Sequence, residues 1–216
     1  MEYFYGIVED RQDPLKVGRV RVRIHGIHTD DKLLIASADL PWCQVILPTT
    51  SAGLSGLGTG HGLVEGSTVF GYFRDGADCQ EPMVIGSLPG VPAELADSTK
   101  GFYDPAAIYP KYKGEPDTNR LAVADADNPH LSLELRKLTR ITGVPTADFD
   151  LVAIQDHIST EIPASDGDTW NQPEVPYAAS YPFNHVYESE SGHIREYDDT
   201  KGNERIYEAH RVGTSY

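Results

Sequence analysis

Arginine alternates with a β-branched apolar residue from Arg19 to Ile24, and no other feature of the chain constrains its fold as strongly. Successive side chains of a β-strand point to opposite faces, so Val20, Val22 and Ile24 share one face and the arginines share the other. One apolar and one charged face are typical of an antiparallel strand that covers a core on one side only. The segment RVRVRIHGI (residues 19–27) therefore predicts such a strand.

Four further short β-rich segments lie within residues 1–90. They are YFYGIVED (3–10), LPWCQVILP (40–48), STVFGYFRDG (67–76) and EPMVIGSLPG (81–90), with glycine or proline turns between them. The second of these is largely apolar, which favours a central strand. Five short strands with glycine bends predict a small closed barrel, and the OB-fold is the five-stranded Greek-key version. We therefore expect residues 1–90 to form an OB-fold barrel in a mostly β protein.

Residues 91–180 show no clear period along most of their length and are rich in proline, glycine and aspartate. Their aromatic residues need a surface to lie on, so we expect an extended strap that is ordered. One short helix is expected within it, over residues 129–142, because Asp127 or Asn128 can cap it and Pro129 suits its first turn. Four apolar residues fall on one face of this helix: Leu131, Leu135, Leu138 and Ile141.

The terminal segment, residues 181–216, predicts two strands, HIREYDD (193–199) and ERIYEAH (204–210). The turn TKGN joins them, and its Gly202 can adopt a positive φ. A two-stranded hairpin is at best marginally stable in water, and this one has little apolar content. We therefore expect it to pair with something outside the chain.

Composition excludes several classes of function. The chain carries 33 acidic and 18 basic side chains, a formal charge of −15. This charge repels phosphate backbones, so binding of a specific nucleic acid is not expected. Cys43 and Cys79 lie in apolar, strand-like contexts and are expected to be buried free thiols. No apolar run reaches the roughly 18 residues of a membrane-spanning helix, and without a secretory signal the chain is expected to be made in the cytoplasm.

No catalytic, cofactor or metal site is predicted. The glycine-rich loop from Gly53 to Gly62 lacks the ending of a phosphate-binding loop, and the histidines lack metal-ligand spacing. Carboxylates are abundant in the middle segment, but no pair is arranged as glycoside hydrolysis requires. The arginine row, which consists of Arg19, Arg21 and Arg23, favours a partner-protein interface or a face of cross-strand salt bridges. Oligonucleotide binding is less favoured, because it needs aromatic side chains on which the bases can stack. The residues that alternate with these arginines are valine and isoleucine instead.

Motifs at both ends of the chain resemble one family. The string SGHIREYDDTKGNERI resembles the start of the trimeric β-helix in the central spike of contractile tails. That family comprises the cell-puncturing spike proteins of T-even-like phages and the valine-glycine repeat protein G of type VI secretion. YGIVEDRQDPLKVGRVRVRIHGIHTDD resembles its N-terminal barrel, and LPWCQVILPTTSAGLSG and VEGSTVFGYFRDG continue the match in order. KGFYDPAAIYPKYKGEPDTNRLA is similar to the segment that leaves that barrel.

The resemblance implies a structural protein of a phage tail baseplate, assembled in the host cytoplasm and carried in the virion. It implies a homotrimer that caps the tail tube and helps to pierce the host envelope. Its expected partners are a hub protein trimer with a tail-tube-like fold and a separate needle or tip protein. Some family members carry a lysozyme domain, and this chain is expected to lack it. The alternatives are a nucleic-acid- or glycan-binding OB module and a peptidoglycan-degrading spike lysozyme.

Contacts with other chains are expected at two surfaces. The arginine row is the expected contact with the hub or another partner. The start of the intertwined trimeric β-prism is expected at residues 181–216. Its expected trimer contacts are Tyr187, His193, Ile194, Tyr197, Ile206, Tyr207 and His210.

Overall fold

The computed structural model describes residues 2–91, 117–123, 161–163, 165–171, 178–190 and 193–209. These residues form two compact units, one before residue 116 and one from residue 116 onward. Each unit has its own cluster of buried apolar side chains. The helix predicted over residues 129–142 lies outside the described residues. Among the described residues, no helix has the length and apolar character needed to cross a membrane.

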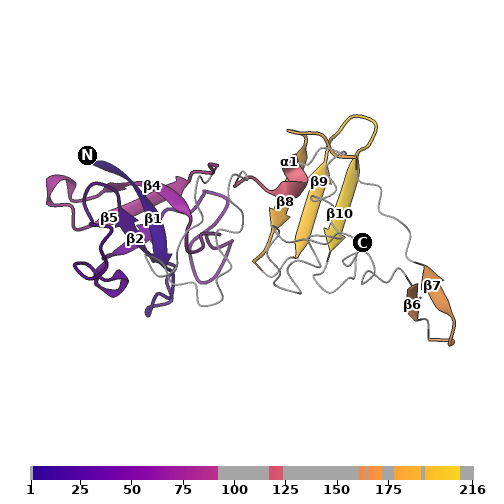
Figure 1. Ribbon diagram of the computed structural model, residues 1–216, viewed down its shortest axis with the longest axis horizontal. Helices are drawn as coiled ribbons and strands as arrows, with labels where there is room; N and C mark the ends of the chain where they lie inside the picture. Colours follow the sequence, from indigo (N-terminus) through magenta and orange to yellow (C-terminus); the bar gives the residue numbers. More distant parts are fainter. Residues whose placement is uncertain are drawn as a thin grey trace. The chain divides into compact units, whose positions relative to one another are not determined.

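The first unit is a closed barrel of five strands (Figure 1). The strands are β1 (Tyr3–Asp10), β2 (Val20–Ile24), β3 (Trp42–Val45), β4 (Thr68–Phe73) and β5 (Pro82–Ser87). Around the barrel they follow the order β1-β2-β3-β5-β4, and β4 pairs back onto β1. All neighbours are antiparallel except β3 and β5, which are parallel. The predicted five-stranded barrel in a mostly β chain is therefore confirmed, and each predicted segment contains one strand.

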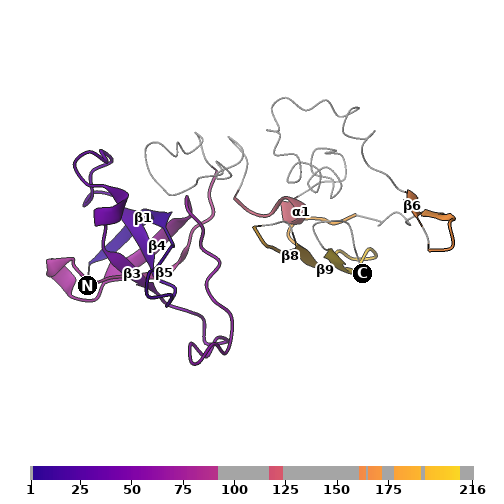
Figure 2. The same cartoon turned by 90° about the horizontal axis from the view of Figure 1, so that it is seen from below.

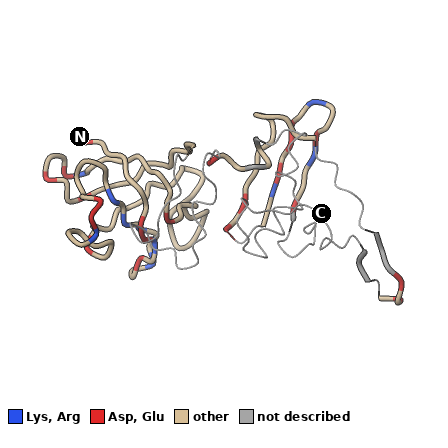
Figure 3. The backbone as a smooth tube through the Cα atoms, viewed as in Figure 1, with Lys and Arg blue, Asp and Glu red and all other residues tan. Residues whose placement is uncertain are grey.

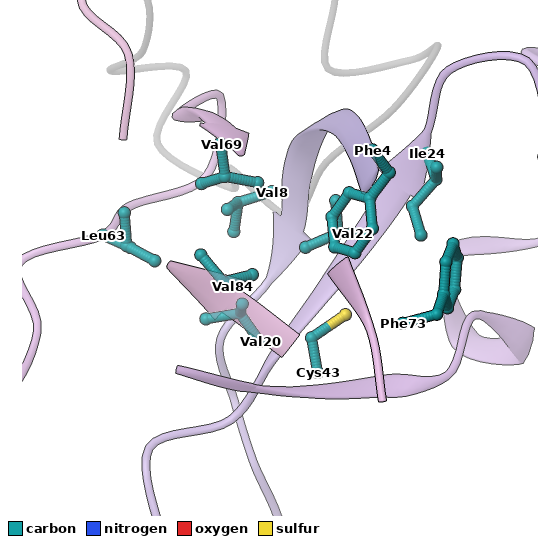
Figure 4. Close-up of a cluster of buried hydrophobic side chains, with 10 residues drawn as sticks. All are labelled: Phe4, Val8, Val20, Val22, Ile24, Cys43, Leu63, Val69, Phe73 and Val84. Carbon is teal, nitrogen blue, oxygen red and sulfur yellow. The ribbon is translucent and has the colours of Figure 1, made fainter. Parts of the chain in front are cut away.

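Alternate residues of these strands fill the barrel interior (Figure 4). Val20, Val22 and Ile24 of β2 are fully buried, as the alternation of their strand predicts. Phe4 of β1 packs against Phe73 of β4 with ring centroids 5.1 Å apart. The rest of the cluster comprises Val8, Cys43, Leu63, Val69 and Val84.

Gly71 of β4 allows the barrel wall to approach its own core closely. A Cβ atom at this position would lie 2.3 Å from the carbonyl oxygen of Met83 and 2.5 Å from Cζ of Phe4. Both distances are far below van der Waals contact, and one of the two atoms belongs to the backbone. A residue without a side chain is therefore required where β4 passes β5 and the ring of Phe4.

The second unit contains a three-stranded antiparallel sheet in the order β10-β9-β8. Its strands are β8 (Asn184–Glu188), β9 (Ile194–Asp198) and β10 (Arg205–Ala209), and the short helix α1 (Arg120–Val123) lies against β8 (Figure 2). Strands β6 (Glu161–Pro163) and β7 (Thr169–Asn171) form a separate two-stranded pair. The two predicted terminal strands are present as β9 and β10, whereas β8 and α1 were not predicted.

Helix α1 supplies the apolar cover for one face of this sheet. Leu121 is fully buried and packs with Ile194 of β9 and Tyr207 of β10, and Val186 of β8 borders the same cluster. The side-chain amide of Asn184 donates to the carbonyl oxygen of Leu121 at 3.0 Å. The predicted hairpin therefore finds part of the support it needs within its own chain.

Candidate assembly surfaces

Arg23 of the arginine row lies inside the first unit. Its Nε donates to Oε1 of Glu9 at 2.5 Å, and its Nη2 donates to Oε2 at 3.0 Å. Nη1 donates to the carbonyl oxygen of Thr29 at 2.5 Å, and Nη2 also donates to that of Ile35 at 2.9 Å. The side chains of Arg23 and Glu9 are both buried, because the loop between β2 and β3 covers them. Strand alternation predicted that β2 has a polar face. The loop between β2 and β3 covers that face at Arg23, so this arginine is buried.

Arg19 and Arg21 both lie over the ring of Trp42. Their guanidinium carbons are 5.5 Å and 4.4 Å from its centroid, which is within the range of cation–π attraction. Nη1 of Arg21 also donates to the carbonyl oxygen of Ser37 at 2.9 Å. A second link therefore joins β2 to the loop before β3.

Asp13 organises the turn between β1 and β2. Its carboxylate accepts backbone N–H groups from Leu15, Val17 and Arg19 at 3.0, 3.0 and 3.2 Å. It also accepts the Arg19 guanidinium, with Nη2 at 2.7 Å. The bond from the Arg19 side chain, followed by those from the backbone, holds the pKa of Asp13 well below its usual range. The turn built on Asp13 thereby fixes the start of the arginine row.

The outer face of the terminal sheet, defined as the side turned away from Leu121, is exposed. Strand pairing sets His185, Tyr197 and Ile206 side by side in one row across the three strands. A second row pairs Tyr187 with Arg195, which in turn pairs with Glu208. Tyr187 is 69% exposed and Ile206 is 70% exposed. Large apolar side chains with this exposure on one face of a sheet are candidates for contact with another chain.

The inner face of the same sheet holds a buried polar group. Oε1 of Glu196 accepts Nδ2 of Asn184 at 2.7 Å and Nη2 of Arg205 at 2.8 Å. Glu196 is fully buried, and this burial raises the pKa of its carboxyl group despite the hydrogen bond from Asn184 and the charge of Arg205. These three residues come one from each strand, so their hydrogen bonds link all three strands on the inner face.

The predicted trimer contacts fall into separate groups. Three of them lie exposed on the outer face: Tyr187, Tyr197 and Ile206. Ile194 and Tyr207 lie on the inner face, 5% and 3% exposed, so the structure places them in the core of a single chain. His193 is half-buried just before β9, where its backbone exchanges hydrogen bonds with Ser189. His210 lies outside the described residues.

Sequence reasoning missed the inner polar group and its cover. Ile194, Glu196 and Asp198 stand at alternate positions, which places them on one face of the strand. This pattern could have identified the polar group on the inner face. Leu121 carried no such signal, because α1 has only one turn.

Comparisons with known proteins agree with this architecture. Residues 24–157 match the family model described as the Gp5 N-terminal OB domain. The chain is 37% identical over 242 residues to Protein Gp5 of Vibrio phage KVP40, an alignment that covers 99% of this chain and 54% of that protein. It is 43% identical over 127 residues to the pre-baseplate central spike protein Gp5 of Enterobacteria phage T4, covering 56% of this chain and 22% of that protein.

The chain thus spans about half the length of the first relative and about a fifth of the second. The family model covers more than half of this chain, and its match runs through β3, β4 and β5 of the barrel. The chain therefore belongs to the family of the Gp5 N-terminal OB domain.

Proposed function

We propose that this chain is a structural component of a contractile phage tail baseplate, in which three copies form the central spike. The observation that carries the proposal is the terminal sheet, with one face closed by Leu121 and the other exposing Tyr187, Tyr197 and Ile206. An apolar face of this kind gains buried area when copies of the chain meet. The name of the T4 relative, a pre-baseplate central spike protein, supports the role and the place in the virion.

The edges of the terminal sheet support assembly as well. Within the described residues, β8 and β10 each pair with β9 alone. Unpaired edge strands present rows of backbone donors and acceptors that favour pairing with another chain. Three copies that meet through their outer faces and sheet edges would form the intertwined prism of residues 181–216, and Tyr187, Tyr197 and Ile206 are the proposed contacts.

The barrel is the proposed site of contact with the hub trimer. Within the arginine row, Arg19 and Arg21 keep side-chain exposures of 21% and 16%, so they remain the proposed partner contacts. Arg23 is committed to Glu9 and the neighbouring loop. We expect its contribution to partner binding to be indirect, through the rigidity of that loop.

The proposed role is mechanical, without catalysis. Release of soluble fragments from purified peptidoglycan tests this point, and the expected rate equals that of buffer alone. Lysis that disappears on changing a single carboxylate within residues 128–165 would contradict it and favour the spike lysozyme.

Size-exclusion chromatography with light scattering tests the trimer. The full chain is expected to elute at three times the chain mass at micromolar concentration. The double variant Tyr197→Ser, Ile206→Ser should elute as a monomer with an unchanged circular dichroism spectrum. The matched control is Leu33→Ser, Leu34→Ser, two exposed residues of the barrel, and it should remain trimeric. A monomeric wild-type chain, or a double variant that stays trimeric, rejects this assembly.

A further inference from the structure

Four aromatic side chains form a continuous patch on the outside of the barrel. Tyr3 and Tyr5 of β1 pair in register with Tyr72 and Phe70 of β4. The ring of Phe70 stacks on Tyr3 at 5.6 Å between centroids and packs on Tyr5 at 5.1 Å. We call these four residues the aromatic face. It shares no residue with the arginine row.

Two residues of the aromatic face, Tyr3 and Tyr5, are exposed although they are apolar, and Phe70 and Tyr72 are half-buried. Tyr3 is 61% exposed and Tyr5 is 56% exposed. The inward residues of the same strands, such as Phe4 and Val69, already fill the core, so packing inside the barrel does not require aromatic residues on the outside. Clustered tyrosine and phenylalanine side chains at a surface are typical of protein interfaces, where large rigid rings bury area at low entropic cost.

Carboxylates gather at one end of this face. Glu2 directly precedes Tyr3, and its carbonyl oxygen accepts the backbone N–H of Phe73 at 2.9 Å, which places it beside the turn that follows β4. The pKa of the Cys79 thiol is raised first by burial and then by the charges of Asp75, Glu2 and Asp78, so all three carboxylates act on this turn. Figure 3 marks the acidic residues of the turn between β4 and β5.

One cation in this turn is already neutralised. Arg74 is bound to Glu81, with Nε 2.7 Å from the carboxylate. The acidic rim, defined as Glu2, Asp75 and Asp78, therefore keeps a net negative charge next to the aromatic face.

We propose that the aromatic face with its acidic rim is a docking surface for a different protein chain, whose own contact surface has an apolar centre and a basic edge. A second copy of this chain is the less favourable occupant, because two acidic rims and two chains of charge −15 would then meet. The barrel is closed, so the partner docks on side chains and adds no strand. This inference rests on the proposed function only in requiring a partner at the barrel.

The test uses the full chain and two synthetic amphipathic helical peptides, one of leucine and lysine and one of leucine and glutamate. Binding is followed by NMR of the aromatic side chains at about 150 mM salt, where long-range attraction is screened. The lysine peptide is expected to bind and to shift the signals of Tyr3, Tyr5 and Phe70. The glutamate peptide is expected not to bind.

Two variants probe the two halves of the surface. Tyr5→Ser with Phe70→Ser should weaken binding of the lysine peptide about tenfold, as expected for loss of aromatic anchors. Glu2→Gln with Asp78→Asn leaves the apolar residues intact and should weaken it about threefold. The matched control Leu33→Ser, Leu34→Ser should bind as the wild type does.

Four outcomes would overturn the inference. The lysine peptide does not bind, both peptides bind equally, or the control variant loses as much affinity as the aromatic variant does. The fourth is contact of Tyr5 with residues 92–116 of its own chain before peptide is added. Cross-linking of Tyr5 to Tyr5 between two copies would likewise assign the face to self-association. The four peptide-binding and contact outcomes leave the light-scattering result untouched, so the trimer and the docking surface can fail separately.

Discussion

At the scale of single residues, the three arginines of one strand have three different electrostatic environments. Arg23 is buried and bonded to Glu9, Arg21 lies over Trp42, and Arg19 is tied to Asp13. A buried guanidinium is costly to hold without a partner, whereas a partly exposed one is solvated by water. The three positions therefore differ in their importance for stability although they alternate regularly in the sequence.

Removing the partner of Arg23 is expected to destabilise the barrel strongly. Glu9→Gln leaves the buried guanidinium with a neutral partner, and breaking a buried pair costs about 3–5 kcal/mol. Glu81→Gln breaks the exposed pair with Arg74 and should change the stability little, because water solvates both groups. Denaturant unfolding followed by the fluorescence of Trp42, in a Trp170→Phe background, measures both. Equal effects of the two substitutions would show that burial does not decide the outcome.

The buried carboxyl group of Glu196 predicts a pH dependence of the terminal sheet. Its pKa is raised in the folded state by burial, so the folded chain binds this proton more readily than the unfolded chain. Its contribution to stability is therefore present at low pH and lost as the pH rises through the folded-state pKa, with a slope of at most about 1.4 kcal/mol per pH unit.

Glu196→Gln removes this titration. The free energy of unfolding of the wild type, relative to the variant, is expected to fall as the pH rises above the usual glutamate range. The signal to follow is the methyl resonance of Ile194 during chemical denaturation, at concentrations below those of assembly. A relative stability that rises with pH would contradict the assignment.

At the scale of elements, the strands that the sequence predicted are β-rich segments, either alternating or largely apolar, with turn residues beside them. β1 occupies the predicted residues 3–10 in full. β8 was missed because NHVYE is short and half polar, and α1 because a single turn leaves no helical period to detect. The burial of Arg23 was missed for another reason. The alternation of side chains along a strand predicts on which face a residue lies, but it does not predict which other segment covers that face.

The approach of β4 to the core predicts a sharp difference between two glycines. Gly71→Ala places a methyl group against the backbone of Met83 and the ring of Phe4, and overpacking of this kind costs about 1–3 kcal/mol. Gly86→Ala in the neighbouring strand β5 meets no atom within 4 Å and should change stability little. Thermal unfolding of the two variants compares them directly. A stable Gly71→Ala variant would mean that the strand can shift to make room.

Helix α1 is expected to hold the terminal sheet through one side chain. Leu121→Ala removes the contact with Ile194 and Tyr207, and large-to-small changes in a core cost about 2–5 kcal/mol. Leu33→Ala makes the same chemical change at a residue that is 95% exposed, where the loss should be small. Hydrogen exchange of the β9 amides reports the result, with faster exchange expected only for Leu121→Ala. Unchanged exchange would place the support of the sheet elsewhere.

At the scale of the whole molecule, association has to overcome charge. Each copy carries −15, so three copies brought together repel one another, while the outer face with Tyr197 and Ile206 attracts through apolar area. Salt weakens the repulsion and leaves the apolar term in place. Docking of a basic partner on the aromatic face responds in the opposite direction, because salt there screens an attraction.

Ionic strength is therefore expected to separate the two kinds of contact. Between about 10 mM and 150 mM salt, where the Debye length falls from about 30 Å to about 8 Å, the weight-average mass of the full chain should rise toward that of the trimer. Over the same range the affinity for the lysine peptide should fall. Light scattering measures the first quantity, and NMR titration measures the second. A trimer that dissociates as salt is added would mean that ion pairs between copies, such as Arg195 with a neighbouring carboxylate, outweigh the apolar face.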